Sequence, residues 1–214
     1  MKHFLLDTHY QLGNFREHTL GVVAVMDWGL QESALLEDPT VLGVTCSLSF
    51  QETGFKTRLE KILQHPKVKA VRQVFPQMGP IWKNGVKLLA AKGSVCEIEL
   101  KEDQFYQLSE FAQQLPQASF ILTISHPLRM GYDLKQISFS KNIAIKVLGG
   151  CFTFELMRSC ILDLIDRFST DRVMFGGFSE SEYENLLKIV SDFTDEEKEK
   201  LFAFSAKSWY KLAS

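Results

Sequence analysis

Residues 94–100 read Ser-Val-Cys-Glu-Ile-Glu-Leu, a short apolar run with two glutamates two positions apart. Side chains two apart on a strand point to the same face, so Glu97 and Glu99 share one face and Cys96 and Ile98 the other. If the apolar face meets helices, both carboxylates point inward. Such runs recur along the chain with helical or polar segments between them, which is typical of parallel strands joined by crossover helices. The eight runs are Phe4–Leu12, Gly21–Trp28, Val41–Leu48, Val68–Phe75, Ser94–Leu100, Ser119–Ser125, Asn142–Leu148 and Arg172–Phe175.

Helical periodicity fills most of the segments between these runs and continues after the last one. Eight strands fit a closed barrel, and barrels of this kind begin at about 200 residues. The connections at 15–20 and 30–39 are too short for full helices. We therefore predict an α/β fold, a compact TIM (β/α)8 barrel with abbreviated early crossover helices, in a single domain over residues 1–214. The expected helices are Phe55–Gln64, Ile81–Ala91, Gln104–Gln114 and Phe154–Phe168, followed by a helical tail from Ser181 to Leu212 with a break near Phe193–Thr194.

Composition narrows the class of protein. The net charge of -2 and the pI near 6.2 supply no basic field for a nucleic-acid backbone. No run approaches the roughly eighteen apolar residues of a membrane span, and the first apolar stretch reaches Asp7 before a signal sequence could form. The four cysteines stand singly in apolar stretches, which favours reduced thiols. We expect a cytoplasmic protein that binds neither nucleic acid nor membrane, and the sequence leaves its oligomeric state open.

Several short motifs, in order along the chain, carry a resemblance to a known family. The chain resembles the amidohydrolase-2 family, the metal-dependent TIM-barrel hydrolases that include pyrone-dicarboxylate lactonase and related decarboxylases. The likeness is spread over most of the chain. It rests on Asp-Thr-His-Tyr-Gln at 7–11, His-Pro at 65–66 with Val-Arg-Gln at 71–73, His-Pro at 126–127, Ile-Lys-Val-Leu-Gly at 145–149, Asp-Arg-Val-Met-Phe-Gly at 171–176, and the tail from Leu201 to Leu212.

The resemblance implies a site at the carboxyl ends of the strands, where barrel enzymes place their chemistry. His9, Arg72, Glu97 or Glu99, His126 and Lys146 would converge there.

Two departures from the family pattern affect the implied metal site. The second histidine of the Asp-x-His-x-His motif is Gln11, a poorer ligand for zinc than imidazole. The family's Phe-Gly-Ser-Asp is Phe-Gly-Gly-Phe at 175–178, so Phe178 replaces an aspartate that binds metal or accepts a proton. Glu180, two positions on, is a candidate substitute at the start of a helix. We therefore expect no bound cofactor, and a weak site for zinc or another divalent ion would have only His9 and Gln11.

Four of the candidate residues have alternative interpretations. Glu97 and Glu99 form either a structural ion-pair network with Arg72 and Lys146 or a catalytic acid/base pair. Arg72 is either a fork for a substrate carboxylate or the partner of one of these glutamates. His126, which precedes a proline, either belongs to the site or closes a turn.

The aromatic residues near the predicted strand ends, together with Met78, also have two interpretations. They either roof a pocket for a planar ligand or belong to the core. The set comprises Trp28, Phe50, Phe75, Met78 and Trp82.

The sequence predicts catalytic roles for His126, Glu97 and Glu99 and substrate binding by His9, Gln11, Arg72 and Lys146. The predicted function is that of a hydrolase acting on a small-molecule carboxylate such as a lactone or cyclic ester, with an altered, metal-poor site. The alternative is a catalytically silent barrel that retains a small-molecule pocket.

Overall fold

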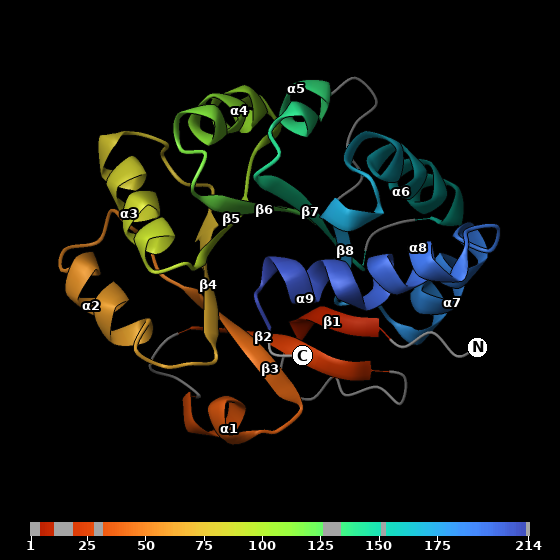
Figure 1. The fold of residues 1–214 in the computed structure, drawn as a ribbon, viewed down its shortest axis with the longest axis horizontal. Helices are drawn as coiled ribbons and strands as arrows, with labels where there is room; N and C mark the ends of the chain where they lie inside the picture. Colours follow the sequence, from red (N-terminus) through yellow and green to blue (C-terminus); the bar gives the residue numbers. More distant parts are fainter. Residues whose placement is uncertain (1–4, 11–18, 28–31, 126–133, 151–152, 213–214) are drawn as a thin grey trace.

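The computed structural model describes residues 5–10, 19–27, 32–125, 134–150 and 153–212. Eight parallel strands form one sheet in sequence order, and β1 lies beside β8, so that the sheet curls into a nearly closed barrel (Figure 1). The predicted fold class is confirmed, and the strands lie within one or two residues of the predicted runs. They are β1 (Leu5–Tyr10), β2 (Thr19–Asp27), β3 (Val41–Ser47), β4 (Val68–Val74), β5 (Val95–Glu99), β6 (Ser119–Ile124), β7 (Ile143–Leu148) and β8 (Val173–Gly176).

Helices surround the barrel, and the helix described in the connection at 30–39, α1, is short, as predicted. Most of the connection at 15–20 lies outside the described residues. The tail is broken before Thr194, which begins α8 with a capping box to Glu197. The helices are α1 (Glu32–Glu37), α2 (Phe55–Ile62), α3 (Pro80–Ala91), α4 (Phe105–Gln114), α5 (Leu134–Phe139), α6 (Phe154–Phe168), α7 (Glu180–Ile189), α8 (Asp195–Glu199) and α9 (Ser205–Trp209), with 3-10 turns η1 (Glu102–Gln104) and η2 (Thr170–Arg172) and a π-helical turn η3 (Lys200–Phe204).

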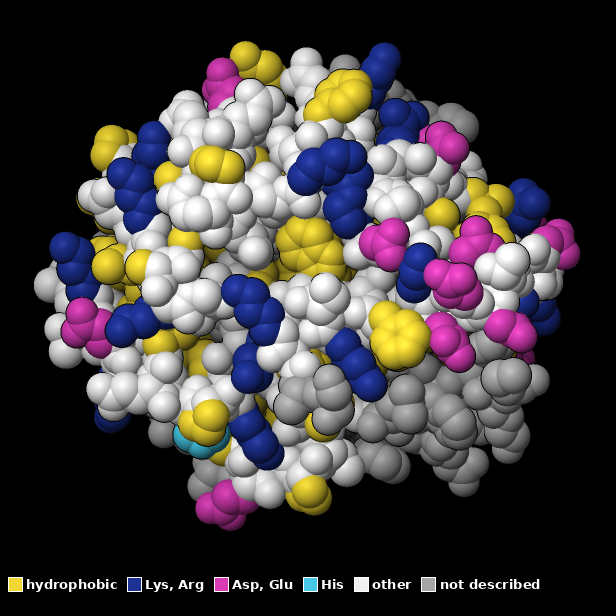
Figure 2. Space-filling model, viewed as in Figure 1, with side chains coloured by type: hydrophobic (Ala, Val, Ile, Leu, Met, Phe, Trp, Pro, Cys, Tyr) yellow, Lys and Arg dark blue, Asp and Glu magenta, His cyan; other side chains and the backbone are white. Residues whose placement is uncertain are grey.

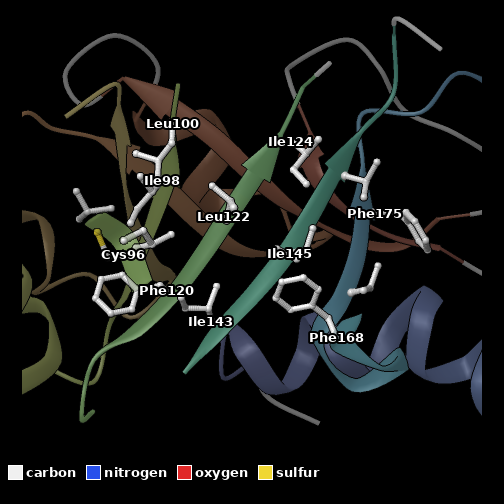
Figure 3. Packing of buried hydrophobic residues seen from close by; sticks show 14 of the residues in the cluster. Cys96, Ile98, Leu100, Phe120, Leu122, Ile124, Ile143, Ile145, Phe168 and Phe175 are labelled. Carbon is white, nitrogen blue, oxygen red and sulfur yellow. The ribbon is translucent and has the colours of Figure 1, made fainter. Parts of the chain in front are cut away.

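The larger apolar core lies between the sheet and the helices. On β5, Cys96 and Ile98 belong to this outer layer, as their alternation with the glutamates predicted. Phe120 on β6 and Ile145 on β7 continue the layer across the sheet (Figure 3). The opposite face of these strands is therefore free to carry polar groups into the barrel.

The C-terminal segment closes the amino-terminal end of the barrel. Small and apolar residues from the first halves of the strands, such as Leu6 and Val95, form an inner cluster with Ala206, Tyr210 and Leu212. In Figure 1, α9 lies in front of the strands, and α8 lies to the side, beside α7. On this face the acidic side chains gather mainly over α8, whereas Lys and Arg are spread more widely (Figure 2).

Side chains tie β8 to β1 where the barrel closes. The hydroxyl of Thr8 donates to the carbonyl of Phe175 at 2.7 Å, and the Asp7 carboxylate accepts the backbone N–H of Gly177 at 2.9 Å. Gly176 lies so close to β1 that a Cβ there would be 2.7 Å from the backbone nitrogen of His9. The glycine is therefore required by the close approach of the two strands.

Candidate functional site

A buried ion pair lies in the middle of the barrel. Lys146 on β7 donates to Oε1 of Glu97 on β5 and, at 3.3 Å, to the carbonyl of Thr8. Both side chains are completely buried. A buried charge is tolerated when it is paired and its remaining hydrogen-bonding capacity is used, and this pair meets both conditions.

Three hydroxyl groups complete the surroundings of Glu97. Thr45 donates to Oε2 at 3.2 Å, Thr123 to Oε1 at 3.3 Å and Tyr210 to Oε2 at 2.8 Å. Both carboxylate oxygens are thereby engaged by donors from β3, β6, β7 and the C-terminal segment. None of the three residues that carry these hydroxyl groups was among the predicted site residues. In the sequence, Thr45 and Thr123 are marked only as polar residues inside mainly apolar strands.

The charges of this pair follow from its surroundings. Burial acts to raise the pKa of Glu97, but the charge and hydrogen bond of Lys146 outweigh it and hold the pKa below its ordinary value. Burial lowers the pKa of Lys146, and the charge of Glu97 opposes that effect. Burial and the neighbouring carboxylate raise the pKa of Tyr210 well above its ordinary value. The pKa shifts of Glu97 and Tyr210 both favour a carboxylate beside a neutral phenol, and Lys146 donates to that carboxylate.

A second ion pair lies one layer closer to the carboxyl-terminal rim. Nη2 of Arg72 on β4 is 2.6 Å from Oε2 of Glu99, and Ser125 donates to Oε1 of Glu99 at 3.0 Å. The side chains of Arg72 and Glu99 are 17% and 13% exposed, unlike the sealed pair below them. Nε of Arg72 is buried and has no hydrogen-bond partner among the described residues. Arg72 thus keeps a donor that its glutamate does not use.

His9 lies on β1 near both ion pairs. Asp7 accepts the backbone N–H of His9 at 2.9 Å, which fixes the strand beside Gly177. Burial, followed by the charge of Lys146, lowers the pKa of His9 to about 4. The imidazole is therefore neutral at neutral pH, and its buried Nδ1 has no partner among the described residues.

The residues after β8 do not supply a ligand or base. Phe178 is completely buried in the outer core, where its ring packs edge-to-face on Phe175 with centroids 5.7 Å apart. Ser179 caps α7 and forms a capping box with Glu182, and Glu180 is the first residue of that helix, as expected. Phe178, at the position where the resemblance implies an aspartate, therefore packs in the outer core.

The described residues do not fit the metal site that the resemblance implies. They contain no group of three or more His, Cys, Asp or Glu side chains arranged to hold an ion. Gln11 and His126 fall outside the described residues, so their predicted roles stay predictions. Of the two candidate metal ligands, His9 and Gln11, only His9 is among the described residues. The positive charges of Lys146 and Arg72 lower the pKa of His9. Positive charges close to His9 oppose the binding of a divalent cation.

The structure brings together five of the predicted site residues and divides four of them into two ion pairs. Glu97 pairs with Lys146 inside the barrel, whereas Glu99 pairs with Arg72 nearer the rim. The predicted catalytic and binding roles of these residues and of His9 are not tested by their positions and stay predictions.

The sequence and structure of this chain were compared with those of known proteins, and the comparison establishes its fold. No protein-family model matches the chain. Solved structures of amidohydrolase barrels superimpose on most of it, at sequence identities that establish the fold alone. The resemblance to the amidohydrolase-2 barrels is therefore confirmed at the level of the fold. None of the helices in the described part of the chain combines the length and apolar character needed to cross a membrane.

The individual relatives are distant. An amidohydrolase from Burkholderia multivorans with bound zinc has a TM-score of 0.77 at 16% identity, over 91% of this chain and 84% of its own. A probable 2-pyrone-4,6-dicarboxylic acid hydrolase from Acinetobacter baumannii, with citric acid bound, has a TM-score of 0.71 at 12% identity, over 99% of this chain and 100% of its own. The uncharacterized protein y4mH of Sinorhizobium fredii is 25% identical over 230 aligned residues. That alignment covers 97% of this chain and 65% of y4mH, so the chain spans just under two thirds of that relative.

Proposed function

We propose that this protein is a hydrolase of amidohydrolase ancestry that acts on a small carboxylated ester or lactone at the carboxyl-terminal rim of the barrel. The observation that carries the proposal is Arg72, a partly exposed guanidinium that is oriented by Glu99 and retains an unpartnered Nε–H. A guanidinium held in this way suits a substrate carboxylate, because it can add a charge-assisted hydrogen bond at little cost in side-chain order. The hydrolase and citrate named for the Acinetobacter structure are consistent with such a ligand.

The reaction proceeds in this proposal without a tightly bound metal ion. Neutral His9 has an unpartnered buried Nδ1 and serves as the acceptor of a proton from the attacking water. The buried ammonium of Lys146 supplies the fixed positive charge of the interior. Glu97, with both oxygens engaged, holds Lys146 in place, and Glu99 positions Arg72.

A silent barrel with a ligand pocket is the second candidate, and one observation favours it. Glu97 is completely buried and receives hydrogen bonds from four side chains, so it cannot replace the lost aspartate as a base without the loss of one of them. In that case Arg72 binds a carboxylate and no turnover follows.

A hydrolysis assay with purified protein separates these candidates. The substrates are 2-pyrone-4,6-dicarboxylate and unsubstituted 2-pyrone, each with and without EDTA or added zinc. We expect hydrolysis of the carboxylated lactone that EDTA does not abolish. Arg72→Met should raise KM about 10- to 100-fold, the equivalent of one charged hydrogen bond. Arg167→Met, which removes an exposed arginine paired with Asp163 on α6, is the matched control.

Each other outcome has a defined meaning. Activity that appears only with zinc would show that the metal-independent mechanism is wrong. Absence of hydrolysis, together with Arg72-dependent binding of the dicarboxylate, would favour the silent barrel.

A further inference from the structure

A cavity of about 420 Å³ lies at the carboxyl ends of β3 and β4. Its wall includes Ser47 and Arg72 from these two strands, Phe75 from the loop after β4 and Trp82 from α3. The volume is within the range of small-molecule sites, which is roughly 300–1,000 Å³. Because Arg72 lines it, the cavity is continuous with the rim at which we place the substrate.

The walls of the cavity are held together by two glutamine side chains. Gln73, which is only 4% exposed, donates to the carbonyls of Leu48 and Arg72, and its oxygen accepts the N–H of Phe50 at 3.5 Å. Gln51 donates across the loops to the carbonyl of Gln77 at 3.4 Å. These contacts join the loop after β3 to the loop after β4, so the cavity is already shaped without a ligand.

The loop after β3 is also fixed by packing on α3. Phe50 is completely buried and lies against Gly85, where an added Cβ would be 2.4 Å from the Phe50 ring. The glycine thereby gives the phenylalanine room beside the helix. This anchoring restricts the movement of the wall that carries Ser47.

Trp82 supplies an unused hydrogen-bond donor in the wall. The residue is 1% exposed, and Nε1 has no partner among the described residues. Its ring is held by Phe120, at 6.2 Å between centroids with an interplanar angle of 19°, and by Phe111, at 5.3 Å and 70°. A buried indole N–H without an acceptor is costly, and a ligand oxygen can remove that cost.

Arg72 and Trp82 reach the cavity from opposite sides of the sheet. Trp82 belongs to the apolar layer between the sheet and the helices, whereas Arg72 stands on the barrel side with Glu99. Nε of Arg72 is the second buried donor without a described partner. Two residues that line the cavity therefore each carry a buried donor without a described partner, one charged and one neutral.

Two of the residues that line the cavity are exposed apolar side chains. Val74 and Phe75 are 50% and 45% exposed, and Phe75 has the left-handed φ of 44° that is uncommon for an aromatic residue. Strained backbone of this kind concentrates at ligand-binding and catalytic sites. Exposed apolar side chains near two buried donors suit a planar ring that carries an oxygen acceptor at each of two positions.

We propose that this cavity selects the substrate, with Arg72 binding a ring carboxylate and Trp82 donating to a second oxygen acceptor on the same ring. The ligand class is a small planar carboxylate that carries this second acceptor, and Trp82 is the residue that distinguishes it from a simple ring monocarboxylate. The inference rests on the proposed function for the placement of the reaction at the rim. It assigns the recognition of the ring to the loops after β3 and β4.

Binding of two probes by calorimetry tests this assignment independently of turnover. Isophthalate carries two ring carboxylates and benzoate carries one. We expect isophthalate to bind more tightly than benzoate, and Trp82→Phe, which keeps a ring and removes the N–H, to weaken isophthalate about three- to tenfold while leaving benzoate unchanged. Trp209→Phe is the matched control, since the Trp209 N–H donates to the Asp171 carbonyl near α9. Equal losses for both probes, or no loss for either, would overturn the role of Trp82.

A measurement on the unmodified protein keeps the test decisive if Trp82→Phe does not fold. The chain has three tryptophans, so their indole N–H signals are resolvable by ¹⁵N NMR, with Trp209→Phe identifying one of them. Isophthalate should shift an indole signal other than that of Trp209, and a ring-proton contact to a Phe111 or Phe120 neighbour identifies it as Trp82. An unchanged Trp82 signal at saturating isophthalate would refute the proposal. Binding without hydrolysis would reject only the proposed hydrolase, whereas hydrolysis of the carboxylated lactone without binding of either probe would reject only the cavity.

Discussion

Replacement of Lys146 by methionine tests the buried ion pair directly. Methionine fills similar space but leaves the completely buried carboxylate of Glu97 without its ammonium, with only Thr45, Thr123 and Tyr210 as donors. Removal of one partner of a buried pair typically costs about 3–5 kcal/mol. For a chain of this size the loss corresponds to a fall in Tm of roughly 6–20 °C.

The pH dependence of that loss identifies its cause. Without the ammonium, burial raises the pKa of Glu97 instead of being outweighed, so the folded variant takes up a proton more readily than the unfolded chain. A raised folded-state pKa in an acid means that stability increases as pH falls. In the unmodified protein the Glu97 pKa is lowered, so the associated stability is complete above the ordinary pKa of 4.5 and is lost only as the pH falls below it. The difference in the free energy of unfolding between the unmodified protein and Lys146→Met should therefore decrease as the pH falls from about 8 to about 5.5.

Urea unfolding at several pH values measures both effects. Lys56→Met, an exposed lysine in the first turn of α2, should change the free energy of unfolding by no more than about 0.5 kcal/mol. The double variant Lys146→Met/Glu97→Gln should be more stable than Lys146→Met alone, because no uncompensated charge remains. A loss below about 1 kcal/mol for Lys146→Met, or a difference that does not vary with pH, would refute the reasoning.

The barrel could be predicted because each of its strands coincides with a short apolar run in the sequence. On β5 the alternation of residues 95–99 also predicted which side chains face inward, since period two is a local property of a strand. The apolar partners Cys96 and Ile98 pack outward in the structure. The fold, and the direction in which side chains point on β5, thus follow from the local sequence.

The pairing of the inward charges could not be predicted in the same way. Arg72 lies beside Glu97 in the sheet register, yet it pairs with Glu99, while Lys146 reaches Glu97 from two strands away. Side-chain length and depth in the barrel decide these partners, and neither is visible in residue spacing. The alternative that Arg72 forms an internal salt bridge was therefore left with either glutamate as its partner.

Tyr210 was beyond prediction for a related reason. A terminal amphipathic helix shows in sequence which of its faces is apolar, but not which end of a barrel it covers. Only the three-dimensional structure shows the phenol passing through the inner cluster to Glu97.

Two further predictions concern the strand junction beside the candidate site. Gly176→Ala should lower stability by about 1–3 kcal/mol in thermal unfolding, because its Cβ would be 2.7 Å from the backbone nitrogen of His9, whereas Gly79→Ala, with no atom within 4 Å, should cost no more than about 1 kcal/mol. Equal effects of the two would contradict the close approach of β1 and β8. For His9, a pKa lowered from 6.5 to about 4 in the folded state means that the unfolded chain binds the extra proton between these values, so the associated stability is complete above 6.5 and is lost as pH falls toward 4. On acidification from about pH 7 to 4.5 the unmodified protein should therefore lose about 2–3 kcal/mol more than His9→Asn, measured by urea unfolding of both. Parallel curves, or an NMR titration of His9 near its ordinary pKa, would show that the imidazole is not buried beside Lys146.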